Sequence, residues 1–113
     1  MYATLGHSPA EAIAIADRAN GTALVAEPDQ AKIGFTSLLL VEDTQHLDGA
    51  STQLSDVGVY QVSVRSMRHQ PQTWERGQPT PGLVAVFGLV AHPDLDHNQA
   101  DTHWRDVHAP LAL

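Results

Sequence analysis

The sequence predicts an α+β domain, in which helices and strands mix without the regular alternation of a parallel βαβ sheet. One capped helix pattern lies near the N-terminus and another near the C-terminus, and most of the strand patterns lie between them. A chain of 113 residues with 42% apolar content can bury one modest core. We therefore expect a single domain over residues 1–113.

The first predicted element is a helix from Pro9 to Asn20. Ser8 is a suitable N-cap, Pro9 occupies the first helical position, and Glu11 stands where a capping box requires an acidic residue. Gly21 follows, and we expect it to adopt the left-handed conformation that commonly ends a helix. The helix is therefore defined at both ends by local signals.

Three strands are predicted next, over residues 22–26, 35–42 and 57–67. The third alternates between apolar and polar residues, so we expect the strand to be half buried, with its apolar face in the core. Its apolar face consists of Tyr60, Val62 and Val64, and its polar face of Gln61, Ser63 and Arg65. The polar segment before it, residues 43–56, is long for a connection and is either functional or mobile.

A connector rich in proline and glycine is predicted over residues 70–82, because proline removes backbone donors and restricts the residue before it. We expect Trp74 to pack down from it as an anchor. The uncharged run that follows, residues 83–91, predicts a central strand covered on both faces. Gly88 in its middle suggests a bulge or a close backbone approach.

The last predicted element is a helix from His97 to Val107. Asp96 is a suitable N-cap, and Gln99 can return the bond of a capping box. Pro110 cannot donate to the carbonyl of the preceding turn, so the helix is expected to kink or end near it.

Charge and composition exclude several classes of function. The net charge is −7 and only six residues are Lys or Arg, so nucleic acid and anionic membranes are not expected partners. The absence of cysteine excludes disulfides, thiolate metal sites and cysteine nucleophiles. No secretory signal, membrane span, phosphate-binding loop or serine nucleophile elbow is present in the sequence. We expect a soluble cytoplasmic protein without a cofactor.

The C-terminal part of the chain, residues 82–113, has the order of motifs of a known family. The motifs are the turn Pro79-Thr80-Pro81-Gly82, the apolar run 83–91, the turn Pro93-Asp94-Leu95-Asp96, the pair His103-Trp104, and His108-Ala109-Pro110-Leu111-Ala112. This order resembles the EthD family, named for a component of a fuel-ether degradation system. Residues 1–69 form a variable N-terminal half in this comparison.

The resemblance implies a ferredoxin-like fold that dimerises through sheet faces into an α+β barrel. It also implies a pocket between sheet and helices, and a substrate that is apolar and organic. The chain departs from the family at Ala100, where a large aromatic residue is usual, and near His92, where a basic residue is frequent. The predicted helix His97–Val107, which carries the family motifs, would be the first helix of the expected βαββαβ unit. Either the chain is therefore truncated, or its N-terminal half supplies the remaining elements.

His108 is the leading catalytic candidate. Helical spacing places it on one face with Asp101, Trp104 and Leu111. An imidazole beside a carboxylate and an indole can act as a general base, and the resemblance implies that it faces the pocket. The alternative is a structural histidine that fixes the turn before Pro110.

We assign proton transfer to His108, with Asp101 or Tyr60 assisting. Substrate-binding residues are expected to be Trp104, Leu111 and Phe87. The reaction type stays open, because barrel relatives include cyclases, decarboxylases, dehydratases and oxygenases. A non-catalytic ligand-binding or assembly domain, or an inactive fragment, is the alternative function.

A metal site is the weaker hypothesis. Two imidazoles and two carboxylates lie within six residues, and such groups can bind zinc or another divalent ion. They are His92, Asp94, Asp96 and His97. A surface turn and a helix cap explain the same residues, so no metal is assigned. His103 and His108 are five residues apart and cannot form the four-spaced pair of a helical metal site.

Overall fold

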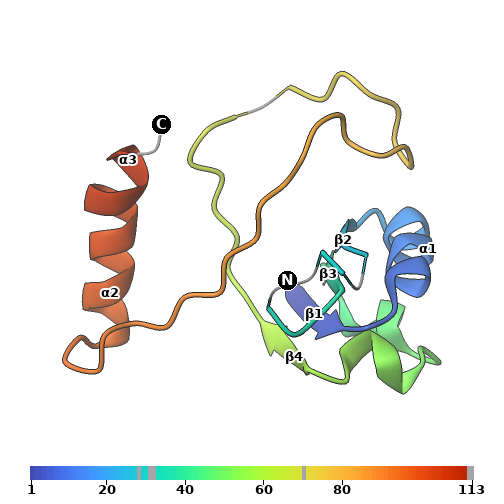
Figure 1. The fold of residues 1–113 in the computed structure, drawn as a ribbon, viewed down its shortest axis with the longest axis horizontal. Coiled ribbons are helices and arrows are strands. Elements are labelled where there is room, and N and C mark those ends of the chain that lie inside the picture. Colours follow the sequence, from blue (N-terminus) through green and yellow to red (C-terminus); the bar gives the residue numbers. More distant parts are fainter. Residues whose placement is uncertain (28, 31–32, 70, 112–113) are drawn as a thin grey trace. The chain divides into compact units, whose positions relative to one another are not determined.

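The computed structural model describes residues 1–27, 29–30, 33–69 and 71–111 (Figure 1). The chain forms two compact units. The sheet unit comprises Met1–Val64 and Trp74–Val84, and the helix unit comprises Arg65–Thr73 and Ala85–Leu113. Each unit combines chain segments that are separated in the sequence.

The sheet unit is an α+β structure with a four-stranded antiparallel sheet. Its strands are β1 (Tyr2–Gly6), β2 (Thr22–Val25), β3 (Ser37–Val41) and β4 (Gly58–Gln61), in the spatial order β2-β3-β1-β4. Because β1 and β2 are both antiparallel to β3, they run parallel to each other with β3 between them. The helix α1 (Pro9–Ala19) connects them.

The core of the sheet unit lies between α1 and one face of the sheet. Ala12 and Ile15 of α1 pack against Leu39 and Val41 of β3, and Leu54 completes the cluster. All five residues are buried. Small residues on this side of the helix allow it to lie close to the sheet, and the buried apolar area drives the packing.

The predicted helix and the first two predicted strands are confirmed, but the C-terminal cap of α1 is not the expected residue. Asn20, with a φ of 55°, adopts the left-handed conformation that we expected at Gly21. Gly21 is needed for another reason, since a Cβ there would collide with the carbonyl group of Leu40. Asparagine tolerates the left-handed region better than most residues, which explains the shift of the cap by one position.

The expected capping box of α1 is also absent. The side chain of Ser8 makes no capping bond, and its backbone N–H donates to Ser37 Oγ at 3.1 Å. Glu11 therefore has no cap N–H to bind, and its carboxylate instead accepts hydrogen bonds from Ser51 Oγ at 2.6 Å and Ser51 N at 3.1 Å. These bonds from Ser51 lower the pKa of Glu11 and tie α1 to the segment 43–56.

That segment contains two short 3₁₀ helices, η1 (Thr44–Leu47) and η2 (Thr52–Ser55). Leu54 of η2 is buried in the core. At least part of the long polar connection is therefore packed structure, held by an apolar anchor and by the hydrogen bonds to Glu11.

The predicted strand 57–67 was wrong in length and burial, because β4 ends at Gln61. β4 is an edge strand that pairs with β1 alone, and Tyr2 near the start of the chain already pairs with Gln61. One more bond, from Val62 N to Met1 O at 2.9 Å, follows the paired residues. Tyr60 and Val64, on the face that was expected to be buried, are 50% and 54% exposed.

The apolar run 83–91 was predicted as a central strand, and this prediction was also wrong. Its residues have no regular secondary structure, and the side chains of Leu83 and Val90 are 103% and 98% exposed. A segment becomes a strand by hydrogen bonding to a neighbouring strand. In the described chain, the sheet consists of β1 to β4, and none of these strands pairs with residues 83–91.

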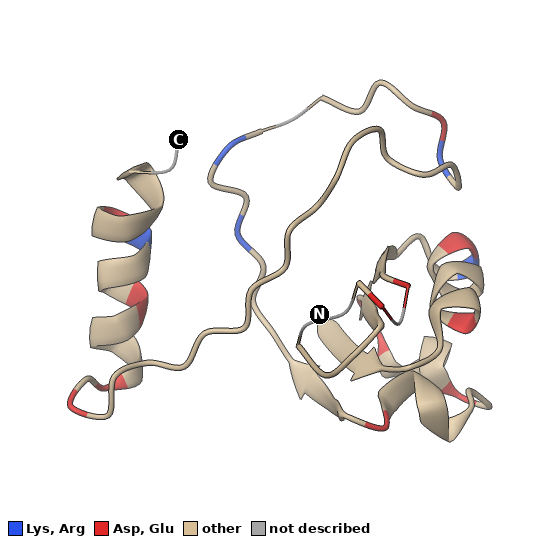
Figure 2. Ribbon diagram, viewed as in Figure 1, with Lys and Arg blue, Asp and Glu red and all other residues tan. Residues whose placement is uncertain are grey.

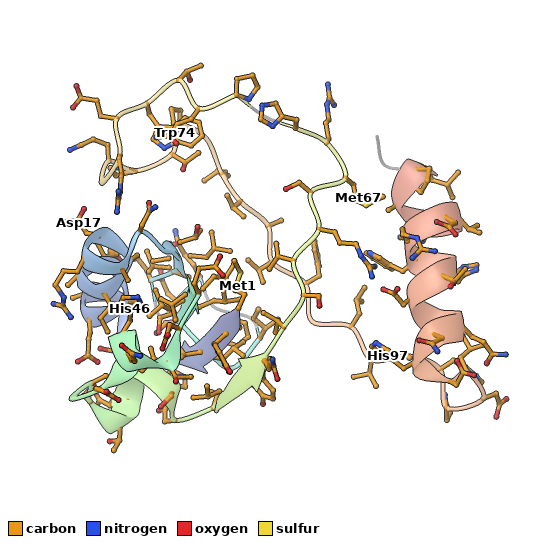
Figure 3. The ribbon with its side chains drawn as sticks, turned by 180° about the vertical axis from the view of Figure 1, so that it is seen from behind. Met1, Asp17, His46, Met67, Trp74 and His97 are labelled. Carbon is orange, nitrogen blue, oxygen red and sulfur yellow. The ribbon has the colours of Figure 1, made fainter. Side chains whose placement is uncertain are left out.

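The connector is irregular over residues 71–82, as predicted; Gln70 lies outside the described residues. Trp74 is partly buried (Figure 3). Arg76 donates a hydrogen bond to the carbonyl oxygen of Asp17 at 3.2 Å, which attaches the connector to α1.

Acidic and basic side chains are dispersed, and Figure 2 shows no basic stripe on the described chain. None of the helices in the described ranges is long and apolar enough to cross a bilayer.

Candidate functional site

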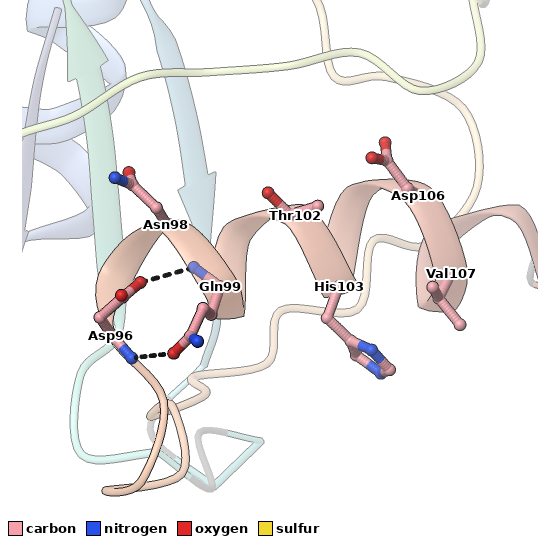
Figure 4. A pocket seen from close by; sticks show the side chains of 7 residues that line it. All are labelled: Asp96, Asn98, Gln99, Thr102, His103, Asp106 and Val107. Atoms are coloured by element: carbon pink, nitrogen blue, oxygen red, sulfur yellow. Dashed lines mark hydrogen bonds between the residues drawn. The ribbon is translucent and has the colours of Figure 1, made fainter.

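The candidate site is built on the helix of the helix unit, which begins with α2 (His97–His103). Its capping box is confirmed: Gln99 N donates to Asp96 Oδ1 at 2.7 Å, and Asp96 N donates to Gln99 Oε1 at 2.9 Å (Figure 4). Two of the unsatisfied donors at the helix start are thereby paired, which fixes where the helix begins.

A wider π-helical turn, η3 (Trp104–His108), follows α2 and leads into α3 (Ala109–Leu111). In this turn, Ala109 N donates to the carbonyl oxygen of Trp104, five residues back. Pro110 has no N–H and would crowd the carbonyl group of the preceding turn in a regular α-helix. The wider turn relieves that conflict, so the helix passes Pro110 instead of ending there.

Trp104 and His108 form a stacked pair within this turn. Their ring centroids are 4.4 Å apart and their planes differ by 21°. Residues four apart on a helix lie above one another, which is the spacing that predicted the pair. The stack fixes one face of the imidazole and leaves its edge, with both nitrogen atoms, available to other groups.

An open hollow of about 410 Å³ lies beside the stack and is lined by Phe87, Leu89, Trp104 and His108. Phe87 was predicted from the sequence as a substrate-binding residue. Leu89 was not, although two residues of separation in an extended chain place both on one side. The side chains of Phe87 and Leu89 are 78% and 66% exposed, so the hollow is apolar and accessible.

Asp101 lies on the same helix but has a different partner. Arg65 binds its carboxylate through two hydrogen bonds, Nη1 to Oδ1 at 2.5 Å and Nη2 to Oδ2 at 3.0 Å. Arg105 approaches Oδ2 at 3.7 Å. The guanidinium of Arg65 lowers the pKa of Asp101, while the carboxylate raises the pKa of Arg65. No hydrogen bond joins Asp101 to His108 in the described structure.

The remaining predicted site residues occupy other places. Tyr60 is on β4 of the sheet unit, and its ring lies over Gly58, where a Cβ would be 2.6 Å from the hydroxyl oxygen. Leu111 is on α3 and is 81% exposed, and it does not line the hollow. Ala112 of the family motif lies outside the described residues.

A second open hollow, of about 480 Å³, lies along the same helix (Figure 4). The residues that line it are mostly of polar types and include both residues of the capping box, although the surface that they turn to the hollow is mainly apolar: Asp96, Asn98, Gln99, Thr102, His103, Asp106 and Val107. Asp106 is paired with Arg105 Nε at 2.7 Å, which lowers the pKa of its carboxyl group. Three of these polar side chains, Asp96, Gln99 and Asp106, are therefore engaged in bonds within the helix and its cap.

The turn before α2 offers little to a metal ion. His92 Nδ1 accepts a hydrogen bond from Asp94 N at 3.2 Å, and Asp96 is used by the helix cap. Among the residues described by the structure, no three His, Asp or Glu side chains form a group that could hold a metal ion.

No protein-family model, curated protein or solved structure matches this chain.

Proposed function

We propose that the chain is an EthD-like protein and that its sheet unit has a ferredoxin-like fold. The parallel pair β1 and β2, connected by α1 and separated by β3, is the split βαβ arrangement of that fold. The order of motifs in residues 82–113 supports the family assignment.

In this proposal the protein is a small enzyme without a cofactor that acts on an apolar organic molecule. One observation carries it: the imidazole of His108 is stacked on Trp104 at the border of an apolar hollow. Phe87, Leu89 and the indole of Trp104 would contact the substrate, and burial of apolar surface would supply the binding energy. His108 would transfer a proton as general base.

Asp101 and Tyr60 would assist this proton transfer. Asp101 is hydrogen-bonded to Arg65, so its first effect is to anchor the helix that carries His108. Tyr60 is on the sheet unit and is 50% exposed.

Ligand binding without catalysis is the second candidate. A general base usually needs a group that orients its ring and fixes its tautomer. Among the described residues, no side-chain hydrogen bond reaches His108. This observation favours a hollow that binds an apolar molecule without reacting with it.

The proposal includes a homodimer formed through sheet faces. The helices of the sheet unit pack on the face that contains Leu39 and Val41. The opposite face presents Leu5, Leu38 and Leu40, which are partly exposed. Covering these side chains with a second copy would bury apolar surface that the unit's own helices leave uncovered.

Proton transfer is tested by deuterium exchange. The protein is incubated in D₂O with a panel of apolar ketones and lactones, and exchange at the carbon next to the carbonyl group is followed by proton NMR. We expect exchange of at least one compound, and a loss of about 10²-fold or more in His108→Gln, the usual contribution of a general base. His103→Gln, an exposed histidine of the same helix, is the matched control and should retain the rate.

Binding is measured separately with the apolar fluorescent probe anilinonaphthalene sulfonate. Trp104→Ala should reduce probe binding, whereas Trp74→Phe should not. Probe binding without exchange of any compound would reject the enzyme and retain the binding domain. Equal exchange by His108→Gln and the unmodified chain would reject the role of His108.

A further inference from the structure

The segment Ala85–Ala91 has a symmetric sequence. It reads Ala-Val-Phe-Gly-Leu-Val-Ala, so residues of like kind stand at equal distances on either side of Gly88. The segment carries no charged residue. Such a sequence presents the same series of side chains to an antiparallel copy of itself.

The backbone of this segment is unpaired. In the described chain, no backbone hydrogen bond involves residues 85–91. Phe87, Leu89 and Val90 are 78%, 66% and 98% exposed. An extended apolar segment with free N–H and C=O groups is a template for pairing with another strand.

We propose that Ala85–Ala91 pairs antiparallel with the same segment of a second copy of this chain, around a two-fold axis at Gly88. In this register Phe87 lies opposite the partner's Leu89, and Val86 opposite the partner's Val90. Aromatic and β-branched cross-strand pairs stabilise antiparallel sheets. A register shifted by two residues would instead place a large side chain opposite an alanine.

Neither charge nor space prevents a second copy from pairing with this segment. The chain has a net charge of −7, which opposes association in general, but the paired segments are neutral and do not repel each other. Gly88 meets no atom within 4 Å of the position of a Cβ, so the centre of the segment is open to an approaching backbone.

The pairing also extends the candidate site. A two-fold axis perpendicular to the two-stranded ribbon keeps Phe87 and Leu89 of both copies on one side of it. Phe87 lines the hollow beside Trp104, so the partner's Leu89 would stand next to that hollow. The pairing of Ala85–Ala91 uses a different surface from the proposed sheet-face dimer. Each of the two contacts can therefore be tested without the other.

The absence of cysteine in the chain allows a direct test of the register. Gly88→Cys places two thiols opposite each other at the axis, within the Cα separation that a disulfide requires. Ala85→Cys is the matched control: six residues separate Ala85 from its partner position, so its two thiols would lie roughly 20 Å apart. The double variant Ala85→Cys/Ala91→Cys restores opposed thiols. All three are oxidised mildly and separated by mass under denaturing conditions.

We expect Gly88→Cys and the double variant to give a cross-linked species of twice the 12.2 kDa chain, and Ala85→Cys to remain single. A single species in Gly88→Cys would overturn the proposal, and so would equal cross-linking in Ala85→Cys. The unmodified chain should show self-association by sedimentation that persists in the sheet-face variant Leu38→Lys. In Leu38→Lys, where the sheet-face contact is removed, assemblies larger than two chains would overturn the closed pair.

Discussion

The sheet unit and the helix unit differ in what holds them together. Every buried side chain among the described residues belongs to the sheet unit, and the apolar cluster around Leu39 joins a helix, a strand and a 3₁₀ helix. The helix unit has a capping box, a stacked Trp104–His108 pair and the Arg65–Asp101 ion pair, and none of its described residues is buried. The sheet unit therefore has a shared core, while the helix unit depends on separate hydrogen bonds, an ion pair and one ring stack.

This difference predicts different stabilities. A shared core couples its elements, so that they unfold together, whereas isolated contacts allow local opening at low cost. The candidate site lies in the helix unit, and binding sites are often drawn from the less stable parts of a structure. A ligand in the hollow beside Trp104 would then stabilise the helix unit by mass action.

The largest expected effect is in the core. Leu39→Ala removes a side chain that is fully buried between the sheet and α1, and should lower the free energy of unfolding by about 3 kcal/mol. Leu111→Ala removes the same atoms from a side chain that is 81% exposed, and should change it by less than about 0.5 kcal/mol. Urea unfolding followed by circular dichroism measures both. Equal losses in the two variants would contradict the contrast between the units.

Local signals account for the parts of the fold that the sequence predicted. Pro9, Asp96 and Gln99 act within one turn of the chain, and the helices begin where these residues place them. The proximity of Trp104 and His108 was likewise predictable from the sequence, because residues four apart on a helix lie on the same face.

Features that depend on distant partners were not predicted. β1 is a central strand made of five residues at the N-terminus, too short to show a clear period. β4 pairs with β1, which lies more than 50 residues away in the sequence, and residues 83–91 have no neighbouring strand in the described chain. Asp101 was expected beside His108, but its partner Arg65 lies 36 residues away in the sequence.

A smaller effect is expected at the start of α2. Asp96→Ala removes the carboxylate that accepts the bond from Gln99 N, and should cost the helix about 1 kcal/mol. Asp94→Ala is the matched control, since it removes the same charge from an exposed residue outside the cap. The helical signal in circular dichroism and the amide exchange rates of residues 97–103 report the loss. If Asp94→Ala had the same effect, charge and not capping would define the start of the helix.

The smallest effect concerns the ion pair that joins Arg65 to the helix. Arg65 lowers the pKa of Asp101 below its ordinary value of 3.8. The pKa of Asp101 is thus lower in the folded state than in the unfolded state. The ion pair therefore contributes fully to stability above the unfolded pKa, and this contribution is lost as the pH falls through the folded pKa. Both groups are exposed and screened by salt, so we expect a small change.

NMR titration of the Asp101 carboxyl carbon, with amide exchange of residues 65–69, measures this change. The carboxyl group should titrate below pH 3.8, and exchange of residues 65–69 should accelerate over the same range. Arg65→Gln should return the titration toward the ordinary value, because the cation that favours the carboxylate is gone. Asp101→Asn should make the exchange of this segment independent of the pH in that range, once the intrinsic rates are removed. A segment that stays protected in both variants would show that apolar contacts hold it, and that the helix unit has more of a core than its exposed side chains indicate.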